Sequence, residues 1–457
     1  MTVLQRGRTL PYVGRYACLL LLALAVSLSV PLPTAVDAPP LGGFYEGSGM
    51  ALLCVAGSSY DMGLQHGSLL RERLRELVAD YLHRSLLCEL GIAQPSLLTY
   101  VRLLDRNLPA DLRQEMQGIA DGAGLSYQDV LLLNVVPDLL GLTQALPCFE
   151  LSPALLGGPG TSDDLSQSVM YRSQRSVGLS CAHFAAWGDA TADGGLLAGQ
   201  NVESGQPDLL TRYRVLVVRR PLRGNASVSL GMTGMVGVWT GMNEEKITAT
   251  LSGSPSVDVR SGGQPLPFIL RHILEHAGNL NQAIHLLLGT SRLCGGNLIL
   301  GDGKAPQAVA VELSAHQHCV FRVDEGSQPV ARTNHFLDLA LAYAQQDVLS
   351  DEAQRVSSAR LAAVQSLLEL NYSWIDPAKA LSILEQDQQT QLRPAEASGT
   401  EGSSASVGIL FDAQRMEVYV TQGDVTRSFA LGNVVASPKA WADAVPTAVS
   451  AGCLLSK

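Results

Sequence analysis

A stretch rich in glycine and serine, residues 152–179, separates two parts of this chain whose apolar residues follow different periods. Before the stretch, apolar side chains recur at the three- and four-residue spacing of amphipathic helices. After it, short apolar runs bounded by Gly, Pro, Asp or Asn are typical of strands. The stretch itself has no sustained apolar period, so we interpret it as a flexible linker. A chain of this kind is expected to form an α+β fold.

The periodicity predicts individual elements on both sides of the linker. Helical spacing is found at residues 60–87, 111–120, 128–140, 267–277, 280–288 and 357–370. Strand-like runs lie at residues 181–187, 195–199, 213–219, 226–230, 297–300, 308–313, 407–411 and 417–421. The glycine-rich segment 231–237 has the wrong spacing for a dinucleotide-binding loop, and we interpret it as a turn. The order of elements fits two sheets covered by helices.

The N-terminal residues are typical of an export signal. Arg6, Arg8 and Arg15 precede an apolar run at residues 17–30, which is shorter than the ~20 residues that span a bilayer. We expect residues 1–38 to be a signal peptide, so that the protein is secreted or lumenal. The alternative is a membrane anchor that keeps the remainder outside the cytoplasm.

Charge and cysteine spacing exclude several classes of function. The formal net charge is −10, and the 32 Lys and Arg residues form no basic run, which argues against nucleic acid as a partner. The eight cysteines include no C-x-x-C pair that would suggest zinc or a thioredoxin-like motif. We expect no metal and no cofactor. We interpret His316, His318 and Cys319 as a solvated strand end rather than a metal site with Cys294. Cys294 and Cys319 are also candidates for a disulfide bridge.

Cys181 is the strongest candidate for a catalytic residue. It stands at the start of a predicted strand, directly after the linker, and the chain has no G-x-S-x-G, H-E-x-x-H, Walker A or G-x-G-x-x-G motif. Its thiol can attack the carbonyl of Ser180, pass through a thioester and release a new α-amine. Because such an amine has a pKa of about 7.7–8.0, it can serve as general base for its own thiol. Inert packing of a buried cysteine is the alternative.

Residues 181–203 resemble the nucleophile segment of the penicillin acyltransferase family, the autoproteolytic acyl-coenzyme A:6-aminopenicillanic acid acyltransferases and their hydrolase relatives. Residues 57–67 and 115–124 are similar to the family's two opening helix motifs. Further blocks follow in the family's order at residues 241–244, 296–302, 311–312, 333–336 and 357–360. The resemblance implies an αββα sandwich, in which two antiparallel sheets lie between helical layers. It also implies a helical segment, 39–180, that precedes a catalytic chain, 181–457.

The resemblance assigns roles by position. Cys181 matches the nucleophile, and cleavage is expected between Ser180 and Cys181. Glu203 matches an acidic residue near the new amine, and Asn334 matches an asparagine of the oxyanion hole. Arg360 matches an arginine that orients the nucleophile or the acidic group. Three further positions match supporting residues: Gln200, Asn201 and Asn243.

The sequence departs from the family pattern around the nucleophile. Glu203 replaces Asp, Ser180 replaces Gly, and Ala182 with His183 replaces small hydroxyl residues. Ser252 stands where the family pattern has another asparagine. A catalytically silent binding protein of the same fold is therefore one alternative function.

The leading hypothesis is hydrolysis of, or acyl transfer from, a linear amide through an acyl thioester on Cys181. A lipid amidase or phospholipase-like hydrolase of the same fold is another alternative. The expected partners are a small amide or acyl-lipid substrate, together with the light and heavy fragments of one precursor, which are expected to remain associated.

Overall fold

A computed structural model describes residues 42–47, 50–89, 101–102, 104–135, 179–204, 212–260, 262–322, 329–396, 406–422, 425–432 and 449–450. The predicted signal, residues 1–38, lies outside the described residues, as does the linker up to residue 178. Among the described residues, no helix has the length and apolar character needed to cross a membrane.

Nine of the described strands form sheet A, in the spatial order β1-β2-β5-β6-β7-β8-β9-β10-β11. Their bounds are β1 (Gly43–Gly47), β2 (Met50–Gly57), β5 (Arg214–Pro221), β6 (Ser227–Met232), β7 (Thr240–Asn243), β8 (Ile247–Gly253), β9 (Gly296–Asp302), β10 (Gln307–Leu313) and β11 (His318–Phe321). Strands β2 and β5 run parallel. The other neighbouring strands of sheet A are antiparallel.

Seven described strands form sheet B, in the order β12-β3-β4-β13-β14-β15-β16, and their pairings are antiparallel. Their bounds are β3 (Leu179–Gly188), β4 (Gly194–Ser204), β12 (Val330–Arg332), β13 (Ser406–Asp412), β14 (Glu417–Gln422), β15 (Val425–Ala430) and β16 (Val449–Ser450). The chain pairs β3 with β4 through a tight turn, so that the residues after the linker lie between the edge strand β12 and β4.

The described helices lie in two groups along the chain. Before the linker these are α2 (Ser59–Leu69), α3 (Arg71–Glu76), the π-helix η1 (Leu77–Glu89) and α5 (Ala110–Ala123). Residues 127–135 are also helical. After the linker these are α9 (Leu266–His276), α10 (Leu280–Gly289), α11 (Leu339–Gln345), α12 (Asp351–Leu370) and α13 (Pro377–Glu396).

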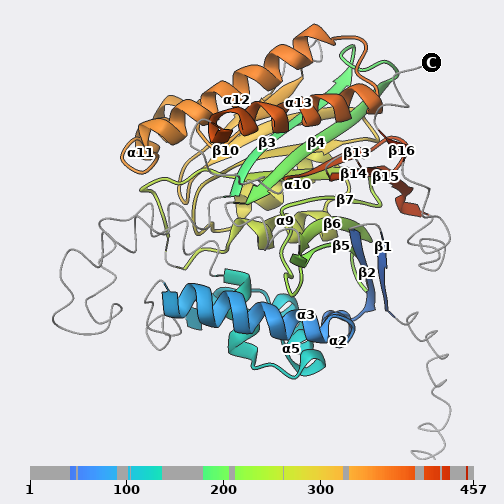
Figure 1. The fold of residues 1–457 in the computed structure, drawn as a ribbon, viewed down its shortest axis with the longest axis vertical. Helices are drawn as coiled ribbons and strands as arrows, with labels where there is room; N and C mark the ends of the chain where they lie inside the picture. Colours follow the sequence, from blue (N-terminus) through green and yellow to red (C-terminus); the bar gives the residue numbers. More distant parts are fainter. Residues whose placement is uncertain are drawn as a thin grey trace, which may run out of the picture. The chain divides into compact units, whose positions relative to one another are not determined.

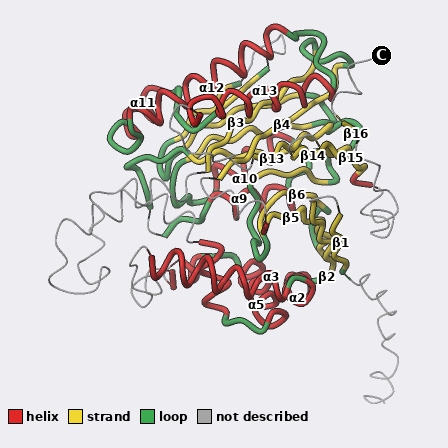
Figure 2. Tube along the Cα trace, viewed as in Figure 1, coloured by secondary structure: helices red, strands yellow, loops and turns green. Residues whose placement is uncertain are grey.

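The two sheets pack face to face, with helices on both outer faces (Figures 1 and 2). Leu216 and Val218 of sheet A share one buried cluster with Ala185, Ala198 and Val202 of sheet B. The outer face of sheet B packs on α12 and α13. The outer face of sheet A packs on α9 and α10 and, toward β2 and β5, on the helices that precede the linker. The αββα sandwich expected from the sequence is therefore confirmed.

The segment before the linker contributes strands as well as helices. Residues of β1 and β2 lie within the segment predicted to be mainly helical, and β2 pairs with β5 from Leu52↔Leu216 to Gly57↔Pro221. Because β2 is buried along its whole length, it lacks the alternating pattern that marks a half-exposed strand. The two sides of the linker thus build one sheet together.

Close packing of α2 against α5 explains the glycines of the two opening motifs. A Cβ atom on Gly63 would lie 2.0 Å from the carbonyl oxygen of Glu115, and one on Gly118 would lie 2.3 Å from that of Tyr60. Gly67 and Gly122 are crowded in the same way. Only glycine permits this approach of the two backbones, so the motifs are a helix-packing device.

Candidate active site

Cys181 lies on β3, between the two sheets, with 2% of its surface exposed. In the β3–β4 ladder it is opposite Val202. Its backbone nitrogen donates a hydrogen bond of 3.0 Å to Oδ1 of Asn334. The fold thus brings together two predicted site residues that are separated by 153 positions in the sequence.

Asn334 follows β12 in a short loop that is held from several sides. The backbone nitrogen of Asn334 donates to Oγ of Ser357 at 3.0 Å, and its Nδ2 donates to the carbonyl oxygen of Gly253 at 2.9 Å. The carbonyl oxygen of Asn334 accepts from Nε2 of Gln345 at 3.3 Å. These partners come from α12, the end of β8 and α11. The side chain of Asn334 is therefore fixed before any substrate binds.

Helix α12 is positioned by a regular N-terminal cap. The side chain of Ser350 accepts a hydrogen bond from the backbone nitrogen of Ala353, and Asp351 and Glu352 lie in the first turn. A capping serine and acidic residues at this end both stabilise a helix. The cap fixes the start of the helix that carries Ser357 and Arg360.

Ser180 and Glu203 are neighbours in the sheet. The β3–β4 ladder sets Ser180 opposite Glu203, one position before Cys181. On its other side Glu203 is opposite Ser406 of β13. The side chains of Ser180 and Glu203 lie outside the described residues. The backbone register still brings the predicted acidic residue beside the bond predicted to be cleaved.

Arg360 is buried on α12 and forms an ion pair with a residue that the sequence did not single out. Its Nε and Nη2 donate to the two carboxylate oxygens of Asp387, on α13, at 2.9 and 2.7 Å. The side chains of Arg360 and Asp387 are 2% and 1% exposed. Asn201 of β4 donates to the same carboxylate at 2.7 Å and to the carbonyl oxygen of Leu384 at 2.8 Å. Asp387 therefore joins two predicted site residues.

Gln200 faces the space between the sheets. Its Nε2 donates to the carbonyl oxygen of Leu251 at 2.8 Å, and its Oε1 accepts from the backbone nitrogen of Leu251 at 3.4 Å. The side chain therefore connects β4 of sheet B to β8 of sheet A. Gln200 lies two positions before Val202, the residue opposite Cys181.

Asn243 does not join the group around Cys181. Its Nδ2 donates to the carbonyl oxygens of Leu274 and Ala277 at 2.8 and 2.9 Å, and its Oδ1 accepts from the nitrogen of Ile247. These contacts close the C-terminal end of α9 against the β7–β8 turn. Asn243 is the last residue of β7, and its side chain both donates and accepts hydrogen bonds at the turn into β8. We therefore interpret Asn243 as structural rather than as support for the site.

His183 is a second residue that the sequence did not assign to the site. It is completely buried on β3, and its Nδ1 lies 2.6 Å from Oγ1 of Thr250 while its Nε2 lies 3.1 Å from Oγ of Ser252. Burial, and then the nearby charge of Arg332, lower the pKa of His183 to about 3. The imidazole is therefore neutral at ordinary pH. A lone histidine in a strand gives no signal of this environment.

Cys54 and Cys319 are two further cysteines whose surroundings the structure describes. Cys54, on β2, lies in the same core between the sheets, and burial raises the pKa of its thiol to about 12, which makes it a poor nucleophile. Cys319 carries a thiol rather than a disulfide, so the candidate bridge with Cys294 does not form. His316 contacts Asp258 and Arg260.

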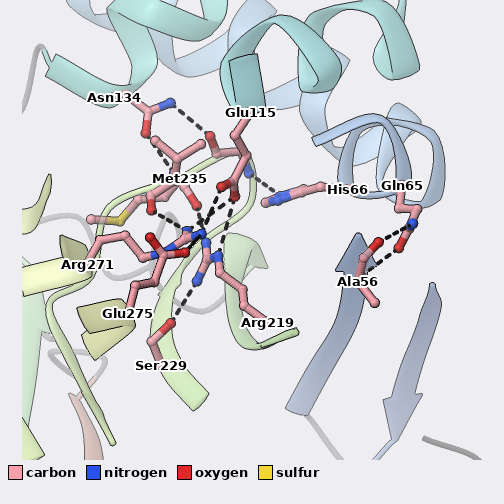
Figure 3. Close-up of polar contacts among 12 residues, drawn as sticks. Ala56, Gln65, His66, Glu115, Asn134, Arg219, Ser229, Met235, Arg271 and Glu275 are labelled. Atoms are coloured by element: carbon pink, nitrogen blue, oxygen red, sulfur yellow. Dashed lines mark hydrogen bonds and ion pairs between the residues drawn. The ribbon is translucent and has the colours of Figure 1, made fainter. Parts of the chain in front are cut away.

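A buried charge cluster joins the segment before the linker to the rest of the fold (Figure 3). Glu115 of α5 lies 3.0 Å from Nη2 of Arg271 on α9 and 3.4 Å from Nε of Arg219 on β5. Glu275 pairs with Arg271, and all four side chains are at most 8% exposed. Burial alone would raise the pKa of Glu115, but Arg271 and Arg219 outweigh it and hold this pKa below its usual value. The cluster balances two carboxylates with two guanidinium groups.

The same segment also holds the turn at residues 233–236. The backbone nitrogen of Gly234 donates to Nε2 of His66 at 2.9 Å. The nitrogen of Val236 donates to Oδ1 of Asn134 at 2.8 Å, and the carbonyl oxygen of Met235 accepts from Arg219 at 3.0 Å. Gly234 has a φ of +82°. The turn interpretation of this glycine-rich segment is thus confirmed, and its contacts come largely from side chains that precede Cys181.

Comparison with known proteins identifies the family. The family model of acyl-coenzyme A:6-aminopenicillanic acid acyl-transferase matches residues 190–424, which is more than half of the chain. The chain therefore belongs to this family. The matched region begins after Cys181, so the match does not itself include the candidate nucleophile.

Similar proteins are known from Archaeoglobus fulgidus and Dictyostelium discoideum. An uncharacterised protein of Archaeoglobus fulgidus is 28% identical over 67% of this chain and 51% of its own length. Protein dcd1B of Dictyostelium discoideum is 24% identical over 58% of this chain and 50% of its own length. The chain thus spans about half the length of these relatives.

Solved structures that match part of this chain share little sequence with it. A conjugated bile acid hydrolase mutant from Clostridium perfringens is 14% identical, with a TM-score of 0.39 over 55% of this chain and 93% of that one. The N-acylethanolamine-hydrolyzing acid amidase ortholog of Caenorhabditis elegans is 15% identical, with a TM-score of 0.36 over 51% and 93%. The penicillin V acylase of Agrobacterium tumefaciens is 13% identical, with a TM-score of 0.36 over 55% and 85%.

Proposed function

We propose that this protein is an autoproteolytic cysteine amidohydrolase or acyltransferase whose N-terminal nucleophile is Cys181. In the maturation step, Sγ of Cys181 attacks the carbonyl carbon of Ser180. The peptide nitrogen of Cys181 leaves as an amine and takes up the thiol proton. Water then hydrolyses the thioester, which frees the Ser180 carboxylate and regenerates the thiol beside a new α-amine.

The hydrogen bond from the backbone nitrogen of Cys181 to Oδ1 of Asn334 is the observation that carries this proposal. The nitrogen in this bond is the atom that cleavage would convert into the α-amine. A bond of 3.0 Å to a fixed amide oxygen would keep that amine in place after the chain is cut. The thiol and its general base would then belong to one positioned residue.

Catalysis would follow the same covalent route on an external amide. Sγ of Cys181 attacks the substrate carbonyl, the amine leaves with a proton from the α-ammonium group, and an acyl thioester remains. Water or a second amine then takes the acyl group. The amide of Asn334 would stabilise the tetrahedral intermediate, a contribution that is typically worth about 3–4 kcal/mol in transition-state energy.

The support from Arg360 would act through its neighbours. Its pairing with Asp387, which also binds Asn201, connects α12 to the strand that carries Glu203. We propose that this connection orients the acidic residue opposite Ser180.

We also propose that the segment before Cys181 remains bound as a light fragment. If the chain is exported, as its N-terminal residues suggest, water is the expected acyl acceptor, because coenzyme A thioesters are scarce outside the cytoplasm.

Two matched variants test the proposal. Cys181→Ala removes the proposed nucleophile, whereas Cys54→Ala removes a thiol from the same buried core on β2. Intact mass after expression should show wild type and Cys54→Ala as two fragments that meet at 180/181. Cys181→Ala should remain one chain and should hydrolyse no amide. A Cys181→Ala protein that is cleaved and active like Cys54→Ala would refute the proposal.

A panel of substrates tests which acyl group is released and whether an amide or an ester bond is cleaved. N-acylethanolamines, penicillins, acyl-homoserine lactones and phospholipids are incubated side by side with wild type and Cys181→Ala. We expect release of the acyl group from at least one amide, and only with wild type. Turnover of phospholipids alone would point instead to ester hydrolysis by the same nucleophile.

A further inference from the structure

His183 lies on the same strand as Cys181 and contacts the opposite sheet. The two residues are two positions apart on β3, so both face the space between the sheets. His183 reaches across that space to β8 of sheet A, where it contacts Thr250 and Ser252. It is therefore a polar link between the strand of the proposed nucleophile and the opposite sheet.

The hydrogen atoms of this link can be assigned from its partners. Oγ of Ser252 lies 2.5 Å from the carbonyl oxygen of Thr333, which can only accept, so the hydroxyl hydrogen of Ser252 goes to that oxygen. Nε2 of His183 must then donate to Ser252. Since a neutral imidazole carries one hydrogen, Nδ1 accepts from the hydroxyl of Thr250.

The link ends at the residue that precedes Asn334. Ser252 bonds to Thr333, whose carbonyl oxygen also accepts from Nδ2 of Asn297 at 2.7 Å. Asn334 in turn accepts from the backbone nitrogen of Cys181. The contacts thus form a closed ring that runs from Cys181 along β3 to His183, across to Ser252, on to Thr333 and Asn334, and back to Cys181.

We propose that His183 is a positioning residue which, through Ser252, fixes the loop of Asn334 relative to Cys181. This inference rests on the proposed function, because the position of Asn334 relative to Cys181 matters only if Cys181 is the nucleophile. Without the link, the loop would keep its contacts with Ser357 and Gln345, and β12 would stay paired with β3. The hydrogen bond from Cys181 to Asn334 would lose a second support, because Thr333 would no longer be connected through Ser252 to His183. A displacement of about 1 Å at such a site can cost about 100-fold in rate.

Side-chain shape gives a sensitive test. The amide nitrogen of Gln can take the place of Nε2 of histidine, whereas Asn reaches only to the position of Nδ1. We therefore expect His183→Gln to retain most of the rate of cleavage at 180/181 and of kcat. His183→Asn and Ser252→Ala should each lower both rates by about 10-fold to 100-fold, with KM changed less than about twofold.

Thr248→Val is the matched control. Thr248 lies on β8 on the same face as Thr250 and Ser252, and its buried hydroxyl has no hydrogen-bond partner in the described structure. This variant should leave both rates unchanged. The double variant His183→Asn/Ser252→Ala should be no slower than the slower single variant, because both changes break one link.

The outcomes separate this inference from the proposed function. If wild type is cleaved at 180/181 and active, but Ser252→Ala and His183→Asn behave like Thr248→Val, the positioning role is wrong while the nucleophile stands. Should His183→Asn fail to fold, Ser252→Ala, which removes a single oxygen, decides alone. Absence of cleavage in wild type would instead overturn the proposed function.

Discussion

His66 and His183 are buried histidines that constrain the pH at which this fold is stable. Burial is the first cause in both cases, and it lowers the pKa of each to about 3. In the unfolded chain a histidine has a pKa near 6.5, so between pH 6.5 and 3 the unfolded state binds more protons than the folded state. Their contribution to stability is therefore complete above about pH 6.5 and is lost as the pH falls.

The direction of this change in stability with pH can be measured on the Cys181→Ala protein, which is expected to remain uncleaved. We expect its free energy of unfolding to fall between pH 6.5 and 5, by up to about 1.4 kcal/mol per pH unit for each buried histidine. His66→Gln, whose side-chain oxygen can still accept from Gly234, should show a shallower slope in denaturant titrations. His276→Gln, at an exposed position, is the control. Equal slopes for all three proteins would show that His66 is not held neutral.

At the scale of elements, Asp387 joins α13 to α12 and to β4. Asp387→Asn keeps the shape of the side chain but leaves the guanidinium of Arg360 buried without its carboxylate. Loss of one partner of a buried pair typically costs about 3–5 kcal/mol. We expect a destabilisation of this order, together with slower cleavage at 180/181, in the full-length protein.

Glu352→Gln is a suitable control for Asp387→Asn, because it breaks an exposed ion pair with Arg355 on the same helix α12. Exposed pairs contribute less than about 1 kcal/mol. Denaturant unfolding in the Cys181→Ala background measures both changes on a single species, and mass spectrometry follows cleavage in the wild-type background. A loss of stability no larger for Asp387→Asn than for Glu352→Gln would remove Asp387 from the account.

At the scale of the whole molecule, we expect the cluster around Glu115 to help hold the two fragments of a cut chain together. Glu115 comes from the segment before Cys181, while Arg219 and Arg271 come from the segment after it. Glu115→Gln would leave two buried arginines with one carboxylate between them. We expect this variant to melt at a lower temperature and its fragments to separate during gel filtration.

Asp121→Asn on α5 is the control for Glu115→Gln, because it removes a charge from an exposed part of the same helix. It should leave the two fragments in one peak and the melting temperature nearly unchanged. The fragments of Glu115→Gln could instead coelute, and the variant could keep the wild-type melting temperature. That result would mean that β2 and the helix packing hold the fragments together without the cluster.

Much of the fold after residue 180 follows from local pattern. The strands from β3 to β6 and the helices α9 and α10 were predicted near their observed positions, because short apolar runs bounded by Gly, Pro, Asp or Asn mark the strands and helical spacing marks the helices. Strand β2 was missed because periodicity alone does not separate a short apolar run from a buried helix, and its parallel partner β5 is distant in the sequence. Helix α13 has no range among the predicted elements, because few residues in its C-terminal half are apolar.

The candidate site was predictable only in part, for a similar reason. Cys181 and Asn334 stand out because their neighbours in sequence match a family pattern, and the structure brings these two together. The contact of His183 with Ser252, and that of Asp387 with Arg360, depend on which strands and helices pack together. No local pattern marks such pairs, because each member is an ordinary polar residue until the fold buries it.

The first residue of the larger fragment tests the central claim most directly. N-terminal sequencing or mass mapping of the mature, active protein should find Cys181 as that residue, carrying an unblocked α-amine. An active protein that remains uncut, or whose larger fragment begins at any other residue, would contradict the account.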